Sequence, residues 1–184
     1  MNTDYERYHR DPFAHDVQLV DHVSYCMSYP LEQYWYSWRA KHIPATNSYL
    51  KKPHVTLMYS YDEIAGFPEV DYEDEVYVQL ASIDHLVIHP ESFLGYKVHT
   101  DPYGIKYLVL LIDPTLVMDQ HEYLKSCGGV WSAQLGEYIP FIIIEAHTEY
   151  TDILAGQLPV PGYTVIFDQI RYCHFGEKHM RLDP

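Results

Sequence analysis

Short stretches of alternating apolar and polar residues, broken by proline and glycine, run along most of the 184-residue chain. Residues 139–147 (IPFIIIEAH) are the most strongly β-forming, and residues 54–60 (HVTLMYS) also predict a strand. Residues 31–43 (LEQYWYSWRAKHI) instead place large side chains at helical spacing, which predicts an amphipathic helix. The pattern further predicts strands over 17–29 and 163–175, and one long strand or two short ones over 76–90. It also predicts a hairpin over 93–113 with its turn at 101–104, and a helix from Asp113 or Thr115 to about Ser126.

The order of these elements is strand, helix, strand, and then strands, helix, strands. That order is a roughly duplicated α+β plan. The length suits one domain, so we expect a single domain over residues 17–184 and a polar arm over residues 1–16. Residues 61–75 are acidic and contain Gly66 and Pro68, so they are predicted to form a loop or lid.

The composition narrows the choice of partners. Acidic residues outnumber basic ones 26 to 12, which gives a formal charge of −14. Such a charge repels nucleic-acid phosphates and anionic lipids, so we expect no extended nucleic acid and no membrane as a partner. A small anionic ligand in a locally positive pocket is compatible with it. The three cysteines have no CxxC spacing and no signal peptide is recognisable, so a cytoplasmic location is expected.

The most informative local motif is the His-x-Thr triplet formed by His54 and Thr56. On a strand these two side chains share one face, about 7 Å apart. Met58 and Ser60 are expected on that same face. A histidine can move a proton while a threonine hydroxyl donates a hydrogen bond to a phosphoryl oxygen, so the pair suits a phosphate group. Taken alone, the triplet is more typical of a partly buried histidine beside a core threonine.

The chain resembles the two-histidine phosphoesterase superfamily, and within it the phage anti-CBASS cyclic-nucleotide phosphodiesterases. The resemblance covers residues 17–175 and includes the KKPHVTLMYS, YLVLLID, EYIPFIIIEA and VIFDQI segments. It implies a two-lobed, pseudo-symmetric α+β fold with antiparallel sheets around a central cleft. In that superfamily each lobe contributes one His-x-Thr or His-x-Ser strand to the cleft. A small cyclic nucleotide or related nucleotide signal is the ligand that the resemblance implies.

The second motif of this resemblance is degenerate. Phe141 stands where the second histidine belongs, and Ile143 stands where the second threonine belongs. Phenylalanine transfers no proton and isoleucine offers no hydrogen bond. Because losing one general acid or base costs about 10²–10⁴-fold in rate, phosphodiesterase activity is expected to be absent or weak.

Other residues were candidates for the same cleft. Glu145 and His147 have the same strand parity as Phe141, so either could replace the missing catalyst if a bulge near Ala146 brings it toward the cleft. The alternative is that both mark the polar end of the strand at the surface.

Two tyrosines complete the predicted ligand-binding set. Tyr25 on the first strand could stack on a base or belong to the core, and Tyr138 precedes the second motif. The full set of expected ligand contacts is Tyr25, His54, Thr56, Tyr138, Phe141, Ile143 and Glu145. No metal ion and no cofactor is expected.

Three functions follow from these observations. The first is a phage anti-defence protein that binds and sequesters a cyclic nucleotide immune signal in the host cytoplasm. The second is an active phosphodiesterase that uses His54, Thr56 and a rewired second catalyst. The third is a non-catalytic structural or interaction module on an inherited fold. If a phosphate lies beside His54, whose ordinary pKa is about 6.5, binding is expected to tighten between pH 8 and pH 6.

Overall fold

The computed structural model describes residues 21–47, 51–60, 62–68, 75–79, 84–101, 104–131 and 135–174. The predicted arm over residues 1–16 lies outside the described residues. The helices are α2 (Tyr29–His42), α3 (Met118–Ser126) and α4 (Asp152–Ala155), with short 3₁₀ turns η2 (Pro90–Ser92) and η3 (Pro114–Leu116). The strands are β1 (Asp21–Cys26), β2 (His54–Ser60), β3 (Glu75–Val78), β4 (Leu86–Ile88), β5 (Phe93–Thr100), β6 (Lys106–Ile112), β7 (Phe141–Ala146), β8 (Val165–Phe167) and β9 (Gln169–His174).

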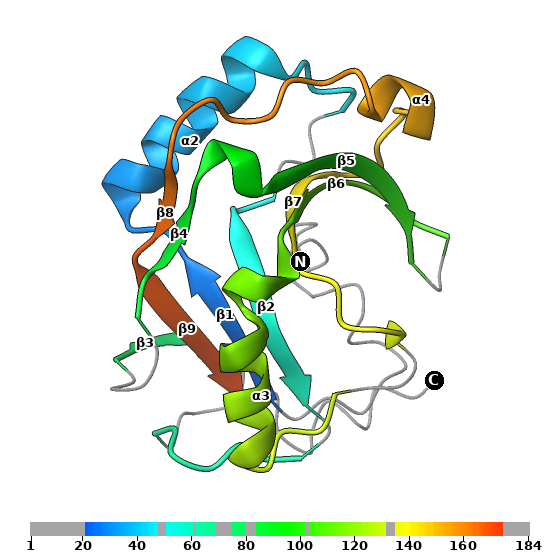
Figure 1. The fold of residues 1–184 in the computed structure, drawn as a ribbon. Coiled ribbons are helices and arrows are strands. Elements are labelled where there is room, and N and C mark those ends of the chain that lie inside the picture. Colours follow the sequence, from blue (N-terminus) through cyan, green and yellow to red (C-terminus); the bar gives the residue numbers. More distant parts are fainter. Residues whose placement is uncertain are drawn as a thin grey trace, which may run out of the picture.

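A seven-stranded sheet forms the centre of the molecule, with strand order β3-β9-β1-β2-β7-β6-β5 (Figure 1). All its pairings are antiparallel. The helix α2 connects β1 to its neighbour β2, and α3 likewise connects β6 to its neighbour β7. Two strand–helix–strand units therefore meet at the β2–β7 pair, which confirms the expected α+β fold with two related halves.

Two predicted strand boundaries were wrong for identifiable reasons. The strand predicted over 17–29 ends at Cys26, because α2 begins at Tyr29 with Pro30 in its first turn, where the missing N–H costs nothing. Residues 76–90 were expected to form one long strand or two short ones, and they contain two, β3 and β4, that belong to different sheets. The strand predicted over 163–175 is likewise divided at Asp168, whose carboxylate accepts a hydrogen bond from the Ser28 N–H at 2.7 Å.

The predicted second helix is confirmed with a different start. Asp113 caps the 3₁₀ turn η3 by accepting a hydrogen bond from the Thr115 N–H, and α3 begins only at Met118. Gly128, with φ of 102°, follows the last turn, and its neighbour Gly129 packs against the backbone of Leu124. A Cβ at residue 129 would lie 2.9 Å from the Leu124 carbonyl oxygen, so the helix end requires glycine there.

The two faces of the central strands bury different sets of residues. One face belongs to the main core, which gathers residues such as Leu108, Leu110 and Ile142 together with Trp35 of α2 and Leu124 of α3. The opposite face carries a smaller apolar cluster of Tyr107, Val109, Ile143 and Ala146, with Ile105, Leu111 and Phe141 packed against it. Among the described residues, no helix is both long and apolar enough to cross a membrane.

Candidate functional site

The strand β2 places His54 and Thr56 on the face opposite the main core. A β-bulge interrupts its pairing with β1, because Val23 lies opposite Met58 whereas the next residue, Ser24, lies opposite Thr56. The extra residue, Leu57, and Met58 are both buried in the main core. The predicted single face containing His54, Thr56, Met58 and Ser60 is therefore wrong, since the bulge shifts the alternation and turns Tyr59 toward the His54 face instead.

Two side chains satisfy the carbonyl groups of β2 around this bulge. The Nδ1–H of His121 on α3 donates to the Leu57 carbonyl oxygen at 2.7 Å. The hydroxyl of Tyr138 donates to the Thr56 carbonyl oxygen at 2.9 Å. The rings of His121 and Tyr138 stack with their centroids 3.9 Å apart. Two stacked rings thus hold both carbonyl groups of the bulge, which keeps the His-x-Thr pair in one orientation.

The two central strands bring the two motif positions together. Both β2 and β7 are fully described, and their ladder pairing is confined to Val55 opposite Ile142. Because this pairing is antiparallel, His54 lies beside Ile143, and Thr56 lies beside Phe141. The expectation that His54 and Phe141 occupy neighbouring strands on one concave surface is confirmed.

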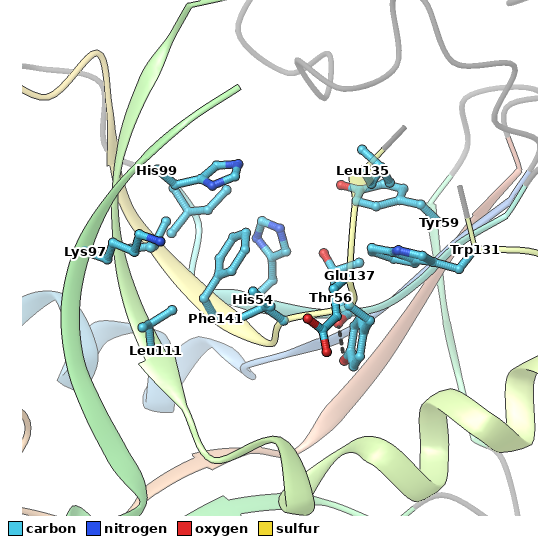
Figure 2. A pocket seen from close by; sticks show the side chains of 14 residues that line it. His54, Thr56, Tyr59, Lys97, His99, Leu111, Trp131, Leu135, Glu137 and Phe141 are labelled. Atoms are coloured by element: carbon cyan, nitrogen blue, oxygen red, sulfur yellow. Dashed lines mark hydrogen bonds between the residues drawn. The ribbon is translucent and has the colours of Figure 1, made fainter. Parts of the chain in front are cut away.

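A cavity of about 340 Å³ opens over these four residues (Figure 2). Val109 and Leu111 of β6 extend its apolar floor beside Phe141 and Ile143. Its volume lies near the lower end of the range of about 300–1,000 Å³ that is typical of small-molecule sites. The cavity is therefore large enough for a small molecule.

The cavity carries polar and aromatic groups that the sequence pattern did not single out. Lys97 and His99 of β5 lie on one side, whereas Tyr59 and Trp131 lie on the other (Figure 2). Glu137 lies between them, near Thr56. The Lys-Val-His spacing of β5 could have indicated that Lys97 and His99 share a face, because residues two apart on a strand do so. Only the order of strands in the sheet shows that this face borders the cavity.

His54 is held as a neutral proton acceptor. Its Nδ1–H donates to the Lys52 carbonyl oxygen at 2.9 Å, so in the neutral ring Nε2 is the nitrogen without a proton. Loss of hydration, together with the positive charge of Arg171, lowers the pKa of His54 to about 4. The free protein therefore holds His54 neutral at pH 7. The expected tightening of binding between pH 8 and pH 6 requires a phosphate beside His54 and stays a prediction.

A second histidine, missed by the sequence analysis, lies on the same face of the neighbouring strand β1. His22 of β1 is 5 % exposed, and its Nε2 lies 3.4 Å from the Thr56 hydroxyl oxygen. Its ring stacks on Tyr59 with centroids 4.2 Å apart and meets the His54 ring edge-on at 6.2 Å. Burial and the nearby Arg171 hold the pKa of His22 well below its usual value, so this ring is also neutral at pH 7.

Glu145 does not reach the cavity. A bulge in β7 places Glu145 opposite Leu108 while Ile143 is opposite Val109, so the extra residue reverses the face of Glu145. Its carboxylate is fully buried and pairs with Arg39 of α2 at 3.3 Å. It also accepts hydrogen bonds from Thr46 and Thr148. The bulge that was expected to bring Glu145 toward the cleft in fact turns it away.

His147 and Tyr25 also lie outside the cavity. His147 is exposed just beyond the end of β7 and has a positive φ of 54°. Tyr25 faces the main core at 1 % exposure, and its hydroxyl donates to the Asp84 carbonyl oxygen at 3.0 Å. Of the expected ligand contacts, the structure brings together His54, Thr56, Tyr138, Phe141 and Ile143.

Comparisons with known proteins were made by sequence and by structure. Compared by sequence, the chain matches no family model and no curated protein. Compared by structure, it is similar to Escherichia coli LigT in a crystal structure complexed with 3′-AMP. The TM-score is 0.42 and the sequence identity 12 %, over 83 % of this chain and 84 % of that chain.

Proposed function

We propose that this protein binds a small nucleotide of the cyclic-nucleotide class in the cavity over β2 and β7 and holds it without rapid cleavage. The observation that carries the proposal is the pairing of an intact motif with an apolar one. His54 and Thr56 line the cavity together with Phe141 and Ile143. One half of the floor can bond polar atoms of a ligand, and the other half can only pack against an apolar surface such as a base or a ribose face.

The protonation states of the histidines favour binding over cleavage. Two-histidine cleavage of a phosphodiester needs one imidazole to accept a proton and another to donate one. Burial lowers the pKa of His99 and the pKa of His54, so at pH 7 both imidazoles of the cavity are mostly neutral. A pair of neutral imidazoles contains a base but lacks an acid of useful strength.

The flat apolar floor suits a nucleobase or ribose. Phe141 is half-buried and Ile143 is 8 % exposed, so both still offer surface to the cavity. Trp131 and Tyr59 add aromatic faces on one side, and stacking of a base on an aromatic ring is worth about 1–3 kcal/mol. These contacts provide affinity for a nucleotide without any transition-state chemistry.

The biological setting of this proposal is phage defence. A phage protein that holds a cyclic nucleotide messenger removes the signal of a CBASS immune response, and affinity and abundance suffice for that role. We therefore include sequestration of a CBASS messenger in the proposed function. Its cellular test is plaque formation on a CBASS-bearing host that expresses either the parent or the His54→Gln, Thr56→Val double variant.

The direct test is incubation with a panel of cyclic di- and trinucleotides of adenine, guanine and uracil. Free ligand is measured by chromatography before and after heat denaturation of the protein. Depletion followed by recovery of intact ligand on heating supports sequestration. Recovery of linear or shorter products instead indicates a phosphodiesterase, and absence of depletion leaves the structural or interaction module as the function.

A further inference from the structure

The edge strand β5 supplies a polar wall, made by Lys97 and His99, that faces the His-x-Thr strand across the apolar floor. Lys97 pairs with Val109 and His99 pairs with Tyr107, so both side chains lie on the cavity face of the sheet. The sheet curves strongly through β5 and β6, which brings this edge over the floor (Figure 1). The ring of His99 lies 5.8 Å from the ring of Phe141, centroid to centroid. An imidazole from β5 therefore lies next to the position where the histidine of β7 is missing.

Lys97 brings a positive charge to an otherwise apolar part of the cavity. The chain has 12 lysines and arginines against 26 acidic residues, so a lysine at a ligand-sized cavity is a feature of this site rather than of the surface as a whole. Among the described residues, no carboxylate forms an ion pair with Lys97. The charge of Lys97 also helps to hold down the pKa of His99, after burial, which places the two groups close to each other.

The opposite side of the cavity has a different chemistry. Trp131 and Tyr59 lie across the floor from Lys97 and His99, with Glu137 nearby (Figure 2). Their rings lie 6.3 Å apart between centroids, with an interplanar angle of 39°. Aromatic faces stack on bases, whereas a carboxylate accepts hydrogen bonds from base amino groups or ribose hydroxyls and repels phosphate.

We propose that Lys97 and His99 form the phosphate subsite of this cavity, so that a bound nucleotide lies with its phosphate toward β5 and its base toward Trp131. This inference rests on the proposed function. Lys97 supplies the charge, and the N–H of a neutral His99 supplies a hydrogen bond to a phosphoryl oxygen. The unprotonated Nε2 of His54 then accepts a hydrogen bond from a ribose hydroxyl rather than donating one to phosphate.

The test measures the affinity of the tightest-binding cyclic nucleotide of the panel by titration calorimetry, for the parent and for Lys97→Ala, Lys97→Arg and His99→Ala. Loss of a charge-assisted hydrogen bond predicts that Lys97→Ala weakens binding by about 10- to 150-fold. Loss of a neutral one predicts about 2- to 12-fold weaker binding for His99→Ala. Lys97→Arg keeps the charge and is expected to retain most of the affinity. In the parent, added salt weakens binding, and in Lys97→Ala this dependence is reduced.

Matched controls separate this effect from general loss of charge or fold. Lys125→Ala removes an exposed lysine of α3, and His147→Asn removes an exposed histidine beyond β7 with a residue that tolerates positive φ. Both are expected to bind as the parent does, and circular dichroism melts establish that every variant is folded. If the parent binds and Lys97→Ala binds equally well, the phosphate subsite is overturned while the proposed function stands. If the parent binds no member of the panel, the proposed function fails and the subsite fails with it.

Discussion

Val55 of β2 lies opposite Ile142 of β7, and this one ladder pair aligns the His-x-Thr triplet with the Phe-x-Ile triplet. An antiparallel pair relates the two strands by a local twofold axis. Each residue of one triplet therefore has a counterpart in the other, with His54 corresponding to Phe141 and Thr56 to Ile143. The degenerate half of the site is thus defined by geometry and can be altered residue by residue.

The first prediction restores that half. The Phe141→His, Ile143→Thr double variant places a second imidazole and a second hydroxyl beside the intact motif. We expect slow cleavage of cyclic nucleotides to appear, with a gain over the parent on the order of 10²-fold or more, because a general acid or base contributes about 10²–10⁴-fold. Product formation is followed by chromatography.

The control for this gain is the same double variant with His54→Gln. Cleavage should return to the parent level, because the imidazole introduced on β7 then lacks the His54 imidazole with which it is aligned. Cleavage that survives His54→Gln would contradict the alignment of the two triplets as the basis of the new activity.

The second prediction concerns how the free energy of unfolding depends on pH. The pKa of His54 is about 4 in the folded protein and about 6.5 in an unfolded chain. As pH falls below 6.5, the imidazole of His54 takes up a proton in the unfolded chain before it does so in the folded protein. The contribution of neutral His54 to the free energy of unfolding is therefore complete above pH 6.5 and is lost as pH falls toward 4. Burial also lowers the pKa of His22, so its effect on the free energy of unfolding has the same sign.

Urea unfolding at pH 7.5 and pH 5 tests this sign. We expect the parent to lose more unfolding free energy between these pH values than His54→Gln, which has no proton to take up at this position. The comparison cancels the titration of the many carboxylates that both proteins share. Equal losses in the two proteins would show that His54 does not carry the low pKa.

The strands over residues 54–60 and 139–147 were predictable, because both stretches are rich in β-forming apolar residues. The sheet faces of the residues that follow each motif were not predictable. One bulge turns Tyr59 toward the cavity, and another turns Glu145 away from it. A bulge reverses every side chain that follows it and has no signature in a pattern of period two.

The distant members of the site were unpredictable for another reason. Tyr25 was expected either to stack on a base or to belong to the core, and alternation along β1 cannot say that its face is the core. His22 and His99 reach the site through strand order, β1 beside β2 and β5 at the sheet edge. Such long-range pairing depends on the whole fold rather than on the residues around each histidine.

The third prediction separates a structural role for Glu145 from a catalytic one. Glu145→Ala leaves Arg39, which is 4 % exposed, buried without its carboxylate partner. Removing one partner of a buried ion pair costs about 3–5 kcal/mol, a large part of the stability of a typical domain. We expect a lower urea midpoint for Glu145→Ala, whereas His147→Asn at the exposed strand end should unfold near the parent midpoint.

Ligand affinity of the same variant supplies the second readout. Measured at low temperature, where Glu145→Ala remains folded, affinity should stay close to that of the parent, since the carboxylate lies on the far face of the sheet from the cavity. A marked loss of affinity in folded Glu145→Ala would place Glu145 in the binding site after all.

The fourth prediction concerns His22, the buried histidine beside Thr56. His22 Nε2 and the Thr56 hydroxyl oxygen are 3.4 Å apart, a weak contact that orients the hydroxyl toward one set of partners. His22→Phe keeps a ring to stack on Tyr59 but removes the nitrogen, and Thr56→Val removes the hydroxyl while keeping the branched shape. If His22 acts by orienting this hydroxyl, the two substitutions are not independent. A double-mutant cycle on nucleotide affinity should then show coupling of about 0.5–1.5 kcal/mol, with the double variant binding no more weakly than Thr56→Val alone. Additive losses would mean that His22 does not act by orienting the Thr56 hydroxyl.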